Sequence, residues 1–130
     1  MIFDLRKFAA VVIASATSFG ASSAFAAGDA ANGANLFKTN ICSACHAVVK
    51  GGANPVGPNL FGVVGRKAGS LAGYSYSPAM KASGMTWDED TLAKYLMSPS
   101  TVVPSNKMIF AGIKKESDAD DVAAYLATLK

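Results

Sequence analysis

Five consecutive residues, Cys42-Ser-Ala-Cys45-His46, carry reactive side chains at a spacing that suits one chemistry. Two cysteines three positions apart lie on the same face of one helical turn, where each thiol can add to a vinyl group of one haem. The next residue, His46, brings an imidazole that can bind the haem iron. We therefore interpret the stretch as a covalent attachment site for one haem c.

The rest of the chain supports this interpretation over its alternatives. The sequence contains two cysteines and one histidine, and all three lie in this motif. A structural zinc site generally needs four Cys or His ligands, one more than the chain has. A thioredoxin-like pair would follow a strand in a βαβ unit, whereas residues 30–40 have a helical pattern. A buried or disulfide-bonded cysteine pair would leave the adjacent histidine unexplained.

The first residues have the order of a secretory signal peptide. Basic residues precede an apolar run at 8–14, and a small-residue stretch ends at Ala26. The run is shorter than the about 20 apolar residues that span a bilayer, so an uncleaved anchor is the weaker alternative. We predict a cleaved leader over residues 1–26 and one exported domain over residues 27–130. Export agrees with the motif, because thiols outside the cytoplasm tend to oxidise and c-type haem is attached in that compartment.

Three segments have the periodicity of helices. The first covers residues 29–40, the second begins with a capping box at Thr86 and stops before Pro99, and the third begins at Ser117. The apolar stripe of the third helix needs a partner. We expect the first helix to be that partner, because Gly33 allows a close approach.

The segment between the first and second helices, residues 51–84, is rich in glycine and proline and is predicted to be loop. A loop of this length is unusual in a compact domain. It becomes reasonable if irregular backbone wraps a flat apolar haem. The predicted fold is therefore all-α, with three main helices and long loops around one covalently bound haem.

The second axial ligand decides what such a haem does. Without another histidine, the choices are methionine, which gives an electron carrier, or an open position that binds gases or reacts with peroxide. The methionines beyond the leader are Met80, Met85, Met97 and Met108. The first two lie in a Ser/Gly-rich loop, and the third continues a helix and suits core packing. Met108 lies in a non-helical segment between Pro104 and Gly112, which favours it as a ligand, with packing in an apolar turn as the alternative.

At this level of detail the sequence resembles class I cytochromes c, specifically the bacterial cytochromes c2 that are related to mitochondrial cytochrome c. The resemblance covers nearly all of residues 27–130. It rests on several blocks: Cys42-Ser-Ala-Cys45-His46, Gly57-Pro-Asn-Leu60, Gly65-Arg-Lys67, Thr86-Trp87, Tyr95-Leu96 and Lys107-Met-Ile-Phe-Ala-Gly-Ile-Lys114. It implies a small haem protein that carries electrons and is not an enzyme.

The resemblance also implies the ligand set. Met108 would be the second iron ligand, opposite His46. The backbone carbonyl of Pro58 would bind the other ring nitrogen of His46 and fix its tautomer. Tyr95 would reach toward the Met108 sulfur.

Further residues would form the haem pocket by the same resemblance. Three apolar side chains would cover the haem and exclude water: Leu60, Leu96 and Phe110. Two aromatic side chains would donate hydrogen bonds to a haem propionate, Tyr76 and Trp87. Arg66 would lie nearby and offset the propionate charge.

The cellular role is the last expectation. We expect a soluble, monomeric periplasmic carrier that binds no nucleic acid and takes electrons from a quinol:cytochrome c oxidoreductase to a terminal oxidase or photosynthetic reaction centre. Docking to these membrane complexes would be transient and electrostatic, although the separation of acidic from basic residues is equally compatible with an ordinary solvated surface. The alternatives are a dedicated electron acceptor of one periplasmic dehydrogenase, or a haem enzyme or gas binder with an open iron.

Overall fold

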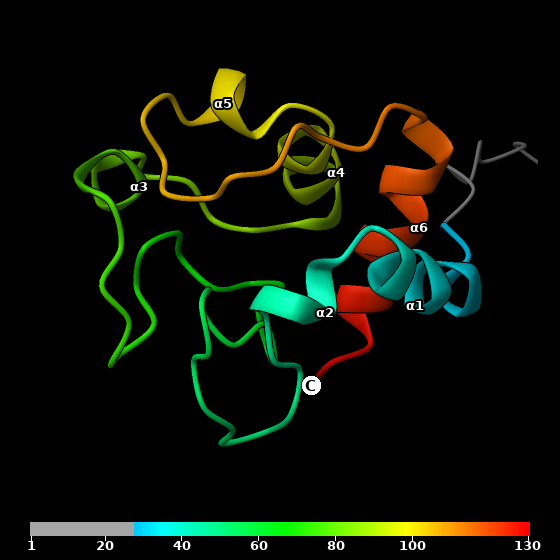
Figure 1. The fold of residues 1–130 in the computed structure, drawn as a ribbon, viewed down its shortest axis with the longest axis horizontal. Coiled ribbons are helices and arrows are strands. Elements are labelled where there is room, and N and C mark those ends of the chain that lie inside the picture. Colours follow the sequence, from blue (N-terminus) through cyan, green and yellow to red (C-terminus); the bar gives the residue numbers. More distant parts are fainter. Residues whose placement is uncertain (1–27) are drawn as a thin grey trace, which may run out of the picture.

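A computed structural model describes residues 28–130, which form six helices and no strand. The helices are α1 (Ala30–Thr39), α2 (Cys42–Cys45), α3 (Pro78–Ala82), α4 (Glu89–Met97), α5 (Pro99–Val102) and α6 (Glu116–Ala127). The all-α prediction is confirmed, with α1, α4 and α6 as its three main helices (Figure 1). The leader predicted over residues 1–26 and its boundary lie outside the described residues.

Helices α1 and α6 cross at a glycine, as the sequence predicted. A Cβ atom added to Gly33 would overlap the backbone carbonyl of Asp121 and lie 2.9 Å from Cβ of Tyr125. Next to this crossing, the rings of Phe37 and Tyr125 pack with centroids 5.6 Å apart. The two helices lie side by side in Figure 1, although more than 70 residues separate them in sequence.

Hydrogen bonds at the start of α1 strengthen this crossing. Asp29 caps α1, its carboxylate accepting from the backbone N–H of Asn32 at 3.0 Å. Asp121 on α6 accepts from the backbone N–H of Asp29 and from the side-chain amide of Asn32, both at 2.7 Å. The amide of Asn32, followed by the backbone N–H of Asp29, lowers the pKa of the Asp121 carboxyl.

We expect Asp121→Asn to destabilise the domain at neutral pH and to have little effect in acid. The folded pKa of Asp121 is depressed, so its contribution is complete above the unfolded pKa and disappears as pH falls through the folded pKa. The expected loss near neutral pH is about 1 kcal/mol, since the site is partly solvated. Urea unfolding as a function of pH measures it. Asp120→Asn removes the same charge from α6 and should have a smaller, less pH-dependent effect.

The start of α4 corrects the sequence prediction. Thr86 does not form a capping box with Glu89, because its backbone forms an isolated bridge with Lys67. Asp88 is the cap instead, and its carboxylate accepts from the backbone N–H of Thr91 at 2.7 Å. The helix stops at Met97, as predicted from the following proline. Helix α6 begins one residue before the predicted start.

The predicted loop over residues 51–84 also contains a short helix, α3. The Ser77 hydroxyl accepts from the backbone N–H of Met80 at 3.0 Å, and Pro78 occupies the first turn, where its missing N–H costs nothing. A five-residue helix is too short to produce a periodic sequence pattern, so the prediction missed it. Its effect is to bury Met80, which the sequence had left in a loop with little to fix it.

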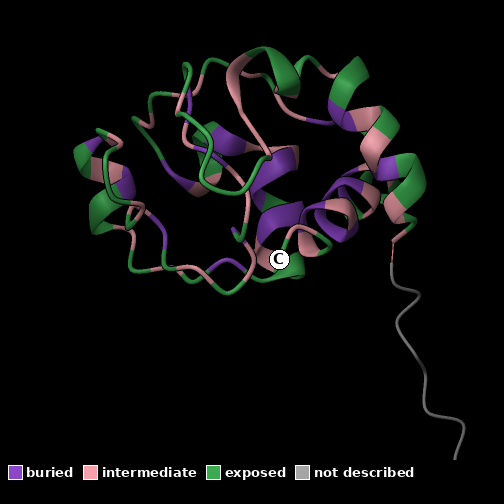
Figure 2. Ribbon diagram, turned by 90° about the horizontal axis from the view of Figure 1, so that it is seen from below, coloured by how far each residue is buried: buried purple, intermediate pink, exposed green. Residues whose placement is uncertain are grey.

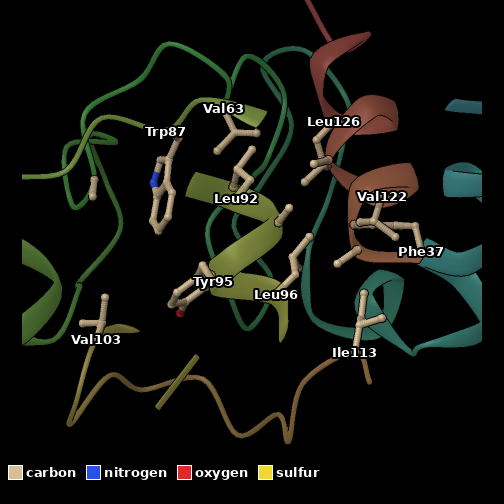
Figure 3. Packing of buried hydrophobic residues seen from close by; sticks show 14 of the residues in the cluster. Phe37, Val63, Trp87, Leu92, Tyr95, Leu96, Val103, Ile113, Val122 and Leu126 are labelled. Carbon is tan, nitrogen blue, oxygen red and sulfur yellow. The ribbon is translucent and has the colours of Figure 1, made fainter. Parts of the chain in front are cut away.

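The core lies between α1, α4 and α6. Figure 2 shows buried residues on the facing sides of these helices and exposed residues around them. In Figure 3, Leu92 and Leu96 of α4 point from one side of this core and Val122 and Leu126 of α6 lie on the other. No helix within residues 28–130 has both the length and the apolar character needed to cross a membrane.

Candidate haem-binding site

One large cavity of about 490 Å³ opens beside this core. Much of its lining comes from α2 and the segment after it, drawn in the lower half of Figure 1, and from α3, α4 and residues 106–110, drawn in the upper half. Its volume lies in the range of small-molecule and cofactor sites. Every site residue predicted from the sequence contributes to the lining: Cys42, Cys45, His46, Pro58, Leu60, Arg66, Tyr76, Trp87, Tyr95, Leu96, Met108 and Phe110.

The two cysteines occupy α2, a single helical turn at the cavity wall. Cys42 and Cys45 are half-buried free thiols at the two ends of this turn. Burial raises the pKa of Cys42, and the nearby Cys45 adds to the effect while a backbone hydrogen bond opposes it. Ile41, just before α2, has a φ of 65°, a strained conformation for a β-branched residue. This turn redirects the chain from α1 so that both thiols reach the cavity.

His46 follows α2, and its tautomer can be assigned from its partner. The ring nitrogen Nδ1 lies 2.8 Å from the backbone carbonyl oxygen of Pro58. A carbonyl only accepts, so the proton resides on Nδ1 and the lone pair on Nε2. Burial lowers the pKa of His46, and the hydrogen bond to Pro58 partly opposes the shift. The imidazole is therefore neutral near pH 7 and can bind a metal through Nε2.

Gly57 fixes the other side of this ring and was not predicted as a site residue. A Cβ atom at position 57 would lie 2.7 Å from Nδ1 and 3.0 Å from Nε2 of His46, closer than real side chains approach. The backbone N–H of Gly57 donates to the carbonyl of Cys45 at 2.7 Å, which holds the glycine against the imidazole. The sequence contains this glycine in a resemblance block, but no spacing signal showed that it faces His46.

Met108 contributes a half-buried thioether to the cavity lining from a non-helical segment. The backbone N–H of Met108 donates to Oδ1 of Asn106 at 2.8 Å. At the end of the segment Gly112 has a φ of 109°, and a Cβ there would overlap the backbone carbonyl of Met97. The next N–H, of Ile113, donates to the carbonyl of Leu96 at 2.8 Å. These contacts place the segment against the end of α4.

Two aromatic residues offer polar groups to the cavity. Trp87 and Tyr95 pack with ring centroids 5.1 Å apart, and Figure 3 shows the indole nitrogen and the phenol oxygen at the edge of the core. Within residues 28–130 no hydrogen-bond partner is present for either group. Burial raises the pKa of Tyr95 to about 12, with a further contribution from Tyr74, so its hydroxyl remains a donor. Both groups can therefore serve a bound molecule.

Arg66 and Tyr76 are partly engaged by the protein itself. The Arg66 guanidinium donates to the backbone carbonyls of Asn59 at 3.0 Å and of Phe61 at 3.4 Å. Burial lowers the pKa of Arg66, although the guanidinium stays charged at neutral pH. The Tyr76 hydroxyl accepts from the backbone N–H of Leu71 at 3.3 Å, which leaves its own O–H free to donate.

The structure adds lining residues that the sequence did not single out. Besides Gly57, these include Met80 on α3, Tyr74 beside Tyr76, and the exposed aliphatic residues Ile41, Val56 and Ile109. The chain brings two thiols, a neutral imidazole and two thioethers, those of Met80 and Met108, to one largely apolar cavity. This donor set and these walls fit a covalently attached haem.

The helical fold and this cavity define a class of small haem-binding electron-transfer domains, and comparison with known proteins identifies the family. The family model for cytochrome c matches residues 30–130. The chain belongs to the cytochrome c family, which binds one covalent haem c and whose members transfer electrons and are not enzymes. The covalent haem of that family accounts for the pair Cys42 and Cys45.

Individual relatives are similar over most of the chain. Cytochrome c of Gibberella zeae is 52% identical over 78% of this chain and 94% of its own length. Cytochrome c2 of Rhodomicrobium vannielii is 52% identical over 82% of this chain and 84% of its own length. Cytochrome c2 iso-2 of Magnetospirillum molischianum is 54% identical over 69% of this chain and 92% of its own length. The protein is therefore an electron carrier of this family.

Proposed function

We propose that His46 and Met108 would bind the iron of one haem c attached to Cys42 and Cys45, and that the protein is a one-electron carrier of the periplasm. One observation carries the proposal. Both thiols, the Nε2-bearing imidazole and the thioether of Met108 line the same cavity, on segments from its two sides. Cytochromes with His/Met ligation have raised reduction potentials and no open iron position.

Haem bound here supplies a reversible one-electron change at its iron. The protein contributes rigidity and exclusion of water. The 2.8 Å contact to the Pro58 carbonyl keeps the His46 ring in one orientation in both oxidation states. Three apolar side chains in the lining limit water at the site and help keep the potential high: Leu60, Leu96 and Phe110.

Polar groups in the lining would stabilise the acidic substituents of the haem. The free donors of Trp87 and Tyr76 are available for a propionate, and the charged Arg66 in the same lining offsets its negative charge. The hydroxyl of Tyr95 is available to the Met108 sulfur. Each of these assignments uses a side-chain donor that is free to bond to a bound molecule.

The proposal also covers where the protein works and which complexes it exchanges electrons with. The leader-like residues 1–26 and the similarity to cytochromes c2 support a periplasmic carrier. It would take electrons from a quinol:cytochrome c oxidoreductase and pass them to a terminal oxidase or a photosynthetic reaction centre. Three exposed aliphatic residues among the cavity-lining residues offer a docking face for brief contact with such complexes: Ile41, Val56 and Ile109.

Met108→Ala tests the ligand assignment. We expect the oxidised variant to lose the sulfur-to-iron charge-transfer band and its midpoint potential to fall, because the thioether that favours reduced iron is gone. Optical spectra and redox titration measure both. Met85→Ala is the matched control, since Met85 is also half-buried but lies outside the cavity lining. An unchanged band in Met108→Ala would refute the assignment.

A further inference from the structure

Charged side chains are almost absent from two long loops beside the cavity. Between Gly51 and Met80, the only charged residues are Arg66 and Lys67. Most of the acidic residues lie elsewhere, at the starts of α4 and α6. Figure 1 draws the two loops, residues 51–65 and 68–77, at the lower left and the start of α6 at the upper right. One side of the domain is therefore nearly free of charge.

The two loops are adjacent in the fold. A small cavity of about 150 Å³ lies between them, lined by five residues of the first loop and by Leu71 and Ala72 of the second. The hydroxyl of Tyr74 in the second loop donates to the backbone carbonyl of Val56 in the first, at 3.3 Å. The loops thus form one continuous surface. We call its residues, 51–56 and 70–75, the uncharged face.

The uncharged face reaches the rim of the haem cavity. Lining residues that are also exposed mark this rim, and three of them are aliphatic: Ile41, Val56 and Ile109. Their exposed fractions are 70%, 68% and 103%. Val56 belongs both to the rim and to the uncharged face. Exposed aliphatic surface therefore continues from the uncharged face to the place where the cavity opens.

Charge is scarce in the cavity lining as well. Within residues 28–130 no acidic side chain lines the cavity, and its basic side chains are Arg66 and Lys107. Arg66 donates to two backbone carbonyls inside the protein. Nζ of Lys107 donates to the backbone carbonyl oxygen of Ser75 at 2.7 Å. The chain itself thus engages both cations.

We propose that the uncharged face and the aliphatic rim form the docking surface for a redox partner whose own docking surface is uncharged and apolar. The inference rests on the proposed function and names the chemistry of the partner. Acidic groups of a partner would lose water here against aliphatic side chains, which is unfavourable without a cation to pair with them. Apolar surfaces bury each other without counter-charges, so the encounter depends little on ionic strength.

The salt dependence of electron transfer tests the chemistry of this partner. Reduced haem-loaded protein is mixed with membranes of its source organism, and the second-order rate constant of its oxidation is measured. We expect a change of less than about threefold between about 0.01 and 0.2 M salt, whereas an encounter steered by charge would slow about tenfold or more. A decrease of that size would overturn the proposal.

Charges of both signs at Val56 provide a sharper test. Val56→Glu and Val56→Lys should each slow the reaction about three- to tenfold, because either charge must lose water against an uncharged partner. If one sign slows the reaction and the other accelerates it, docking is electrostatic and the proposal is wrong. Midpoint potentials of the variants separate a change in docking from a change in driving force.

Ala31→Glu and Ala31→Lys are the matched controls. Ala31 is exposed on α1 and lies outside both the cavity lining and the uncharged face. These variants add the same charges as those at Val56, and their rates should stay within about twofold of wild type. Slowing equal to that of the Val56 variants would show that net charge, and not the uncharged face, controls the reaction.

Electron self-exchange between oxidised and reduced copies needs no membrane partner. Its rate should also change less than about threefold over the same salt range, and a tenfold change would contradict the proposal. If the membranes do not oxidise wild type but self-exchange is independent of salt, the proposed function fails while the docking chemistry is supported. Binding to phosphatidylcholine vesicles that is lost in Val56→Glu would identify a lipid surface as the occupant and overturn the proposal.

Discussion

Alanine at position 57 is expected to displace His46 and to lower the stability of the haem-loaded domain by about 2–4 kcal/mol. The new methyl group would lie 2.7 Å from Nδ1 of the imidazole, so either the ring or the backbone around Gly57 must move. Movement of the ring breaks its bond to the Pro58 carbonyl and turns Nε2 away from its position. Urea unfolding and the absorption spectrum of the purified variant measure the two effects.

Gly51→Ala provides the comparison for that experiment. Gly51 has a φ of 69°, and a Cβ there would meet nothing within 4 Å. This control therefore carries only the cost of a left-handed alanine, about 1 kcal/mol, and should leave the spectrum unchanged. Because Gly57 lacks a left-handed φ, its larger effect would come from contact with His46. A Gly57→Ala protein with a wild-type spectrum and stability would contradict the predicted contact.

Alanine at position 33 is expected to separate α1 from α6 and to destabilise the domain by about 2 kcal/mol or more. Alanine is more favourable than glycine in a helix by about 1 kcal/mol, and this difference alone would stabilise α1. The added methyl would overlap the Asp121 backbone, which cannot rotate away as a side chain could. Overpacking of this kind costs about 3 kcal/mol and exceeds the gain in helix propensity.

Chemical denaturation of the Gly33→Ala protein measures this loss. Asn35→Ala is the control, because Asn35 lies on the exposed face of the same helix and should change stability by about 0.5 kcal/mol or less. Hydrogen exchange locates the effect, with faster exchange expected in both α1 and α6. A Gly33→Ala variant that is more stable than wild type would show that helix propensity outweighs the contact.

The main helices could be predicted because each carries a signal longer than one turn. Periodic apolar residues marked α1, α4 and α6, and Pro99 marked the end of α4. The cap of α4 could not be separated from a nearby alternative, because Thr86 and Asp88 are both good caps and a bridge to Lys67 decided between them. A contact between residues far apart in sequence produces no local pattern.

Some residues of the candidate site could likewise be predicted from the sequence, and others could not. The Cys42 to His46 motif is defined by residue type and by the absence of any other cysteine or histidine. Met108 was favoured among four methionines because it lies in a non-helical segment between proline and glycine, and the family resemblance implied it as the ligand. The contact of Gly57 with His46 and the bond from Lys107 to the backbone of Ser75 depend on atoms brought together by the fold. A glycine facing an imidazole, or a lysine bonded to a backbone carbonyl 32 residues away, has no signature in spacing or composition.

The crossing of α1 and α6 also has a consequence for how the chain is made. Gly33 must meet Asp121, so α1 lacks its main packing partner until the residues of α6 are free to fold against it. A contact over so long a stretch of sequence is slow to form because of the entropy of loop closure. We expect the thiols on α2, half-buried in the folded domain, to be more accessible for haem attachment before that contact forms.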